Sequence, residues 1–180
     1  SESNILLIKK IIEKSDILKK DNFGNTILHL LIRESNFDLF DIVLESIEKS
    51  YANHNDSMRS DSSHSIYNYT NLEGFSPIHL LIDSLSINLN NQSNVPHSVI
   101  EFLIKKSDLN LQNIYGDTCI HLLLKKNLFI KFSKLLKEKE INIFVENKKR
   151  ITPFEIIKNF KNEDYDKIMN IIYRSYYNSL

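Results

Sequence analysis

The stretch that decides the fold is Asp21-Asn22-Phe23-Gly24-Asn25-Thr26-Ile27-Leu28-His29. The same pattern returns twice, as Asn71-Leu72-Glu73-Gly74-Phe75-Ser76-Pro77-Ile78-His79 and as Asn113-Ile114-Tyr115-Gly116-Asp117-Thr118-Cys119-Ile120-His121. A weaker fourth copy runs from Asn147 to Glu155 and has Arg150 in place of the glycine. All three glycines of the chain belong to this pattern, so a repeat organises the sequence.

Each position of the pattern has a physical reason. Asp or Asn opens a turn by bonding its side chain to backbone two residues on, and the glycine supplies the positive φ that a Cβ would oppose. Thr or Ser then caps a helix, and Pro77 and Pro153 lie just inside the helix start, where a missing N–H costs nothing. The pattern therefore predicts a turn, a cap and a helix. Arg150 makes the fourth turn the one that the pattern supports least.

Two helices are predicted in each unit. The segments Leu30–Ile32, Leu80–Ile82 and Leu122–Leu124 are too apolar to be exposed all round, so these first helices lie between neighbours. Second helices follow with amphipathic spacing, seen most clearly at Phe40, Val43, Leu44 and Ile47 and in part at Phe132, Leu135 and Leu136. The match between Ile11–Ile17 and Leu103–Leu109 indicates a partial unit at the amino end.

These residues resemble the ankyrin repeat, whose signature is Asp-x-x-Gly-x-Thr-Pro-Leu-His-x-Ala in a unit of about 33 residues. The resemblance implies an all-α solenoid of helix-turn-helix units with β-turn tips. We expect one domain over residues 1–180, with a partial unit at 4–20, units opening at 21, 71, 113 and 147, and a capping helix at about 163–178.

Two insertions distinguish this chain from the family. Gly24 and Gly74 lie 50 positions apart and Gly74 and Gly116 lie 42 apart, which leaves about 17 and 9 extra residues. The first insertion, residues 50–70, is polar and predicted to be an exposed loop. The second, residues 84–97, separates the two helices of one unit, with Pro96 placed to start the outer helix.

Composition limits the classes of function. Lys plus Arg and Asp plus Glu number 23 each, so no net field recruits nucleic acid or an anionic membrane. A single cysteine excludes an internal disulfide and favours a reducing compartment, and no apolar run approaches the ~20 residues that span a bilayer. We expect a monomer in the cytoplasm or nucleus, including the cytoplasm of a host cell, with neither nucleic acid nor membrane as a partner.

The histidines suggest a metal site and the cysteine suggests a nucleophile, but the positions of these residues do not favour either. His29, His79 and His121 hold one position in successive units, but helices packed ~8 to 10 Å apart cannot offer nitrogens to one zinc ion. The family resemblance implies that they brace the turns. The other three, His54, His64 and His97, lie in the insertions without ligand spacing. We predict no metal, no cofactor and no catalytic residue.

Cys119 follows a helix cap, where a helix dipole lowers a thiol pKa and favours a nucleophile. His121 lies about 200° around the same helix and cannot act as its base. The other interpretation is a small residue at a position where the family prefers proline, and we favour it.

Two surface features, a group of basic residues and an apolar stripe in the last segment, each have two interpretations. The basic residues Lys125, Lys126, Lys131, Lys134, Lys137 and Lys148–Arg150 form either a surface for an acidic partner or an ordinary solvated face. The stripe of Tyr165, Ile168, Ile172 and Tyr176 is typical of a helix that caps the stack, or else of a partner-binding helix with Tyr173 and Tyr177 exposed.

The family resemblance implies that another protein is bound by the turn tips and the exposed ends of the first helices. By position these residues are Asn22, Phe23, Asn25, Arg33 and Glu34 in the first unit, Leu72, Glu73, Phe75 and Asp83 in the second, and Ile114, Tyr115, Asp117, Lys125 and Lys126 in the third. Five of them form an apolar row at the tips, hereafter the tip row: Phe23, Leu72, Phe75, Ile114 and Tyr115. The alternative is that the tip row packs on adjacent turns.

Two functions follow. The first is an adaptor or inhibitor that binds a host or cellular protein, because size and composition resemble the ankyrin proteins of large DNA viruses and effectors of intracellular bacteria. The second is a targeting or structural module of a longer enzyme or effector whose active part lies outside this chain.

Overall fold

The computed structural model describes residues 10–12, 14–53, 65–85 and 95–177, and every regular element in these ranges is helical. The prediction of an all-α fold is confirmed. In chain order the elements are α2 (Ile27–Arg33), η1 (Phe37–Leu39), α3 (Phe40–Asn53), α4 (Pro77–Ser84), α5 (His97–Lys106), α6 (Cys119–Lys125), α7 (Ser133–Leu136), α8 (Pro153–Ile157) and α9 (Asn162–Tyr177).

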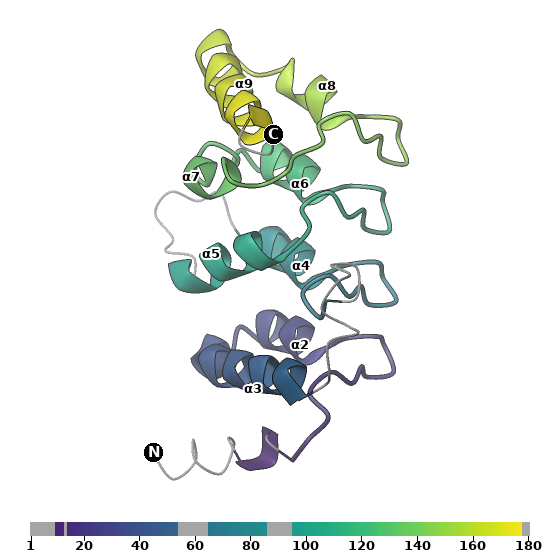
Figure 1. The fold of residues 1–180 in the computed structure, drawn as a ribbon. Coiled ribbons are helices and arrows are strands. Elements are labelled where there is room, and N and C mark those ends of the chain that lie inside the picture. The colour runs from purple at the N-terminus through teal and green to yellow at the C-terminus, as the bar shows by residue number, and fades with distance from the viewer. Residues whose placement is uncertain (1–9, 13, 54–64, 86–94, 178–180) are drawn as a thin grey trace.

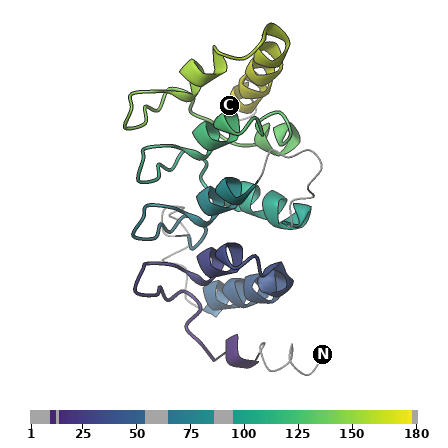
Figure 2. The same cartoon turned by 180° about the vertical axis from the view of Figure 1, so that it is seen from behind.

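The helices form two layers in an elongated stack (Figure 1). The short first helices pack in series, α2 on α4, α4 on α6 and α6 on α8. The second helices form the other layer, in which α5 packs on α7 and α7 on α9. The turns that precede the first helices project to the same side in both views (Figures 1 and 2). The fold therefore presents four turn tips along one edge.

The first turn shows why the repeat needs its opening residue and its glycine. Oδ1 of Asp21 accepts the backbone N–H groups of Phe23 and Asn25, each at 2.8 Å. Gly24 has φ 76°, in the left-handed region, and its N–H bonds to the carbonyl of Asp21 at 2.9 Å. The turns at 71 and 113 repeat this arrangement with Asn as the opening residue.

A second requirement for glycine comes from the next turn in the stack. A Cβ on Gly74 would lie 2.7 Å from the backbone nitrogen of Ile114, and a Cβ on Gly116 would lie 2.7 Å from that of Lys148. Real Cβ atoms do not approach backbone this closely. The glycines thus let consecutive turns stack in contact.

The fourth turn forms although Arg150 replaces the glycine. Arg150 adopts φ 59°, and its N–H reaches the carbonyl of Asn147 at 2.8 Å. A left-handed conformation costs a non-glycine residue about 1 to 2 kcal/mol. No further turn stacks on Arg150 in the described part of the chain, so its side chain has the space that the three glycines lack.

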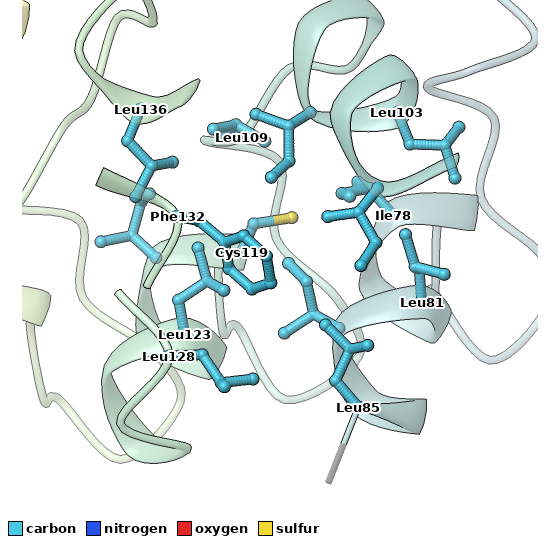
Figure 3. Packing of buried hydrophobic residues seen from close by; sticks show 14 of the residues in the cluster. Ile78, Leu81, Leu85, Leu103, Leu109, Cys119, Leu123, Leu128, Phe132 and Leu136 are labelled. Carbon is cyan, nitrogen blue, oxygen red and sulfur yellow. The ribbon is translucent and has the colours of Figure 1, made fainter. Parts of the chain in front are cut away.

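The core is continuous along the stack and joins the layers. Figure 3 shows Cys119 within this cluster of buried apolar side chains, with its sulfur pointing toward Ile78. Within the layer of second helices, the ring of Phe102 on α5 contacts Phe40 of α3 edge-on, with centroids 6.1 Å apart, and it meets Tyr67 in the same way at 5.5 Å. These contacts bridge the units on either side of the first insertion.

The prediction of an exposed loop over residues 50–70 is wrong at both ends. Helix α3 continues to Asn53, and Ile66 and Tyr67 are buried in the core. Tyr67 is buried four residues before the turn at 71, as Ile17 is before the turn at 21. Residues 54–64 lie outside the described part, as do residues 86–94 of the second insertion, residues 4–9 and 13 of the predicted partial unit and residue 178 of the predicted capping helix. Helix α5 begins at His97, directly after Pro96, as expected.

The last helix, α9, buries Ile168, Ile171, Ile172 and Ser175 against the stack. The predicted stripe is wrong at Tyr176, which is 64% exposed, because the buried face passes through Ser175 instead. No helix in the described ranges has the length and apolar character needed to cross a bilayer.

Candidate binding face

The first three turns project along the edge seen in Figures 1 and 2, and their tips carry apolar residues. Phe23 is 69% exposed, Leu72 75%, Ile114 44% and Tyr115 63%. Backbone hydrogen bonds hold neighbouring tips together: the N–H of Leu72 donates to the carbonyl of Phe23 at 2.9 Å, and that of Lys148 to the carbonyl of Tyr115 at 3.0 Å. Four members of the tip row thus face water, and backbone bonds join the first tip to the second and the third tip to the fourth.

Phe75 differs from the rest of the tip row. It is half-buried, and its ring meets Tyr115 and His79 edge-on at centroid distances of 6.2 and 6.4 Å. Of the tip row, Phe75 is therefore the residue that packs on an adjacent turn, where its ring supports that of Tyr115.

Asn25 and Asp117, predicted as contact residues, are instead buried between turns. Nδ2 of Asn71 donates to Oδ1 of Asn25 at 3.0 Å, and Nδ2 of Asn147 donates to Oδ1 of Asp117 at 2.7 Å. These bonds link each turn to the next one in the stack. A partner cannot reach either side chain without breaking a link, so we withdraw both as contact residues.

The corresponding link is missing between the second and third turns. Phe75 occupies the position that Asn25 and Asp117 hold in their units, and its ring offers no acceptor. Nδ2 of Asn113 is accordingly buried without a hydrogen-bond partner in the described part of the chain. An unpaired buried donor of this kind costs about 1 to 3 kcal/mol.

The predicted contact lysines are engaged within the chain. Nζ of Lys125 lies 2.6 Å from Oδ2 of Asp117. Burial alone would raise the pKa of Asp117, but hydrogen bonds from Lys125 and Asn147 outweigh it, so this pKa lies below its ordinary value. Nζ of Lys126 bonds to the carbonyls of Asp83 at 2.6 Å and Leu85 at 3.3 Å, which closes the carboxyl end of α4.

A shallow hollow of about 250 Å³ lies beside the tips, between the ends of α2 and α4. It brings together three of the predicted residues, Arg33, Glu73 and Asp83. Two further polar residues that were predicted as contacts are exposed outside the hollow. Asn22 lies at the first tip, and Glu34 lies directly after α2. The hollow therefore adds one guanidinium and two carboxylates to the apolar tips.

The three repeated histidines brace the stack. The N–H of Thr26 donates to Nδ1 of His29 at 3.1 Å, and Nε2 of His29 lies 2.9 Å from the carbonyl oxygen of Phe75 in the next unit. Because Nδ1 accepts a backbone N–H, the proton must be on Nε2, which donates to that carbonyl. His79 and His121 make the same pair of contacts, reaching the carbonyls of Leu111 and Ile151.

This arrangement favours neutral imidazole. Burial lowers the pKa of His29, His79 and His121, and that of His79 falls to about 4. A second ring proton would also displace the N–H that Nδ1 accepts. In the described ranges no three His, Cys, Asp or Glu side chains lie close enough to hold a metal ion.

The thiol of Cys119 is fully buried, and this burial raises its pKa. A thiolate is disfavoured there, so the interpretation as a small core residue fits and that as a nucleophile does not.

Sequence reasoning missed the lysines that close helix ends. Nζ of Lys139 donates to the carbonyls of Lys105 at 3.0 Å and Ser107 at 2.8 Å, at the carboxyl end of α5. Burial lowers the pKa of this half-buried amine. The position of Lys126 directly after a first helix was the available signal.

No family model matches the chain. It is similar to a curated protein of Acanthamoeba polyphaga mimivirus whose name is putative ankyrin repeat protein L371, with 28% identity over 168 residues. The aligned segment covers 89% of this chain but 21% of the viral protein, so the chain spans about a fifth of the length of that relative.

Proposed function

We propose that this all-α stack of two-helix units, which resembles the ankyrin repeat, is a binding module for another protein, acting as an adaptor or inhibitor of a host or cellular protein. The partner lies on the tip row and on the adjoining ends of the first helices. The observation that carries this proposal is the exposure of Phe23, Leu72 and Tyr115 on one edge of the stack.

Physical reasoning supports the tip row as an anchor. Burying apolar surface stabilises a complex by about 25 cal/mol per Å², and large rigid side chains supply most of that area. The backbone bond between Phe23 and Leu72 holds their tips in place before a partner arrives, so little conformational entropy is lost on binding.

Charged side chains at the edge of the tip row supply selectivity. The hollow with Arg33, Glu73 and Asp83 favours a partner that offers both a carboxylate and a basic group. Equal numbers of acidic and basic residues in the chain oppose nucleic acid as the ligand.

We also propose a domain organisation, an oligomeric state and a cellular location for the protein. Residues 1–180 act as one domain whose units open at 21, 71, 113 and 147, with α9 closing the stack. The protein works as a monomer without a cofactor and without an activity of its own. It acts in the cytoplasm or nucleus, and the viral relative supports the cytoplasm of a host cell.

A second candidate is a targeting module within a longer effector or enzyme. The observation in its favour is that the similarity to the viral protein is confined to 21% of that protein's length. In this case the tip row directs an activity located elsewhere.

Affinity capture from Acanthamoeba lysate tests the tip row. The wild-type chain and the Phe23→Ala/Leu72→Ala variant are immobilised, and captured proteins are quantified by mass spectrometry. Both side chains are exposed, so helical content stays unchanged while capture of the partner falls by about tenfold or more.

The matched control is Ile11→Ala, because Ile11 is an exposed apolar side chain, at 56%, that lies before the first turn and outside the tip row. This variant should capture the partner as the wild type does. Undiminished capture by the tip variant, or equal losses in both variants, contradicts the proposal.

A further inference from the structure

The stack has a second apolar surface, at its carboxyl-terminal end. Three non-helical segments lead into the turns at 71, 113 and 147: residues 65–70, 107–112 and 140–146, hereafter the connecting segments. Oδ1 of Asn68 accepts the N–H of Asp108 at 2.9 Å, and Oδ1 of Asn110 accepts that of Asn142 at 2.8 Å. Each of the first two connecting segments is therefore covered by the one that follows.

The last connecting segment departs from this pattern. Asn68 and Asn110 each lie three residues before their turn, and the residue at that place before the fourth turn is Phe144. Phe144 is 69% exposed, and its ring rests against Phe154 with centroids 5.7 Å apart. An aromatic surface thus stands where the earlier segments carry a bridging amide.

A groove of about 530 Å³ runs between this segment and α9. Its buried wall includes Ile143 and Ile172, and its exposed rim includes Phe144, Tyr173 and Tyr176. The volume lies within the range of pockets that hold ligands, about 300 to 1,000 Å³.

The equivalent places earlier in the stack are occupied by the chain itself. Segment 107–112 leaves the end of α5 and lies along segment 65–70, and its Leu109 is 1% exposed. Segment 140–146 follows α7, lies along segment 107–112, and buries Ile143. Both segments are non-helical and turn at residues 109–110 and 143–144, and each carries one aliphatic side chain into the core. Polar residues flank Leu109 on both sides, whereas Ile143 lies between Asn142 and Phe144.

A further unit stacked in the same way does not fit at this end. Each turn approaches the preceding glycine so closely that a Cβ would lie about 2.7 to 3.1 Å from backbone. Arg150 carries a side chain at that position. The groove is therefore suited to a short non-helical segment that lies along residues 140–146 without a turn tip placed on Arg150.

We infer that this groove is a second binding site, which takes a short non-helical peptide segment of a partner protein, turned about its aliphatic residue as segment 107–112 is. The segment places a branched aliphatic side chain against Ile143 and Ile172, and its flanking residues are polar and able to bond to the backbone of residues 140–146. The site is separate from the tip row and does not depend on the function proposed for it.

A synthetic peptide with the sequence of residues 107–113, Ser-Asp-Leu-Asn-Leu-Gln-Asn, is the probe, because this segment fills the equivalent place in the stack. It is titrated into the ¹⁵N-labelled chain, and amide shifts are followed by NMR. The expected shifts fall at residues 140–144 and 169–176. A peptide with Asp in place of the first Leu binds at least about tenfold more weakly, because one aliphatic side chain contributes about 1.5 to 3 kcal/mol.

Variants of the chain identify the groove. Tyr176→Ala, at an exposed position, should weaken peptide binding severalfold, whereas the Phe23→Ala/Leu72→Ala tip variant should bind the peptide as the wild type does. The inference is overturned by an absence of shifts at millimolar peptide, by shifts at the turn tips, or by equal binding of both peptides. It is also overturned if the same amides shift on concentrating the chain alone, since a second copy would then fill the groove.

Discussion

The side-chain amide of Asn147 donates to Oδ1 of Asp117 at 2.7 Å and ties the fourth turn to the third. The same bond joins the second turn to the first, but Phe75 interrupts it between the second and third. The row of turns therefore has two polar links and one apolar joint, at which Phe75 supports the exposed ring of Tyr115. A structural link has been replaced at the centre of the proposed binding edge.

The polar links can be tested by matched substitutions. Asn147→Asp places a second carboxylate against Asp117 and should lower the free energy of unfolding by about 2 to 4 kcal/mol at pH 7. Asn113→Asp removes a donor that has no partner in the described ranges and should cost at least about 1 kcal/mol less. Urea unfolding measures both variants, and equal losses would show that the link contributes nothing.

Glycine is required by the stacking of turns as well as by φ. Gly116→Ala brings a Cβ to within 2.7 Å of the Lys148 nitrogen and should cost about 2 to 4 kcal/mol. Arg150→Ala keeps the same left-handed strain without such a neighbour and should change stability by less than about 0.5 kcal/mol. Thermal unfolding compares the two variants. A similar loss of stability in both would show that glycine is required only for its positive φ and not for the stacking of turns.

Acid should loosen the stack in the range where free histidine titrates. The unfolded chain binds protons at an ordinary His pKa of about 6.5, whereas burial lowers that of His79 to about 4 when folded. The unfolded state thus holds more protons between these values, and the free energy of unfolding falls as the pH drops through this window. His79 alone accounts for about 3 kcal/mol, to which His29 and His121 add.

Urea unfolding at pH 7, 6 and 5 measures this dependence. His79→Gln lowers stability at pH 7 but should reduce the slope by up to about 1.4 kcal/mol per pH unit. The pKa of Asp117 lies below its ordinary value, so carboxylates of this kind lose their contribution to the free energy of unfolding only at lower pH. They therefore do not affect the comparison between pH 7 and 5. A stability that is constant from pH 7 to 5 would contradict the assignment of neutral, Nε2-protonated rings.

The amine of Lys139 should stabilise the end of α5. Lys139→Met keeps the aliphatic length but removes the donor to the carbonyls of Lys105 and Ser107, at an expected cost of about 1 to 3 kcal/mol. Lys134→Met is the control, because Lys134 is exposed on α7. Equal stability of the two variants in chemical denaturation would refute the capping role.

The turns and caps could be predicted because each meets a local need of the backbone. Asp21, Gly24 and Thr26 satisfy hydrogen bonds and φ within a few residues, so their spacing is sufficient. The burial of Asn25 and Asp117 could not be predicted in this way. Their partners Asn71 and Asn147 are 46 and 30 residues away and come into contact only once the units have stacked.

Long side chains were the other reason why the structure differs from what the sequence predicts. Charge pattern places Lys126 and Lys139 on the surface, but their aliphatic stems let the amines reach carbonyls at helix ends. Insertions hide core residues in a similar way, since Ile66 and Tyr67 follow a long polar stretch that gives no periodic signal.

The measurement that tests the central claim most directly is hydrogen–deuterium exchange of the chain alone and in complex with the captured partner. The account predicts slower exchange at residues 21–25, 71–75 and 113–117, with unchanged exchange in the outer layer of α3, α5 and α7. Protection confined to that outer layer, with the turn tips unaffected, would contradict it.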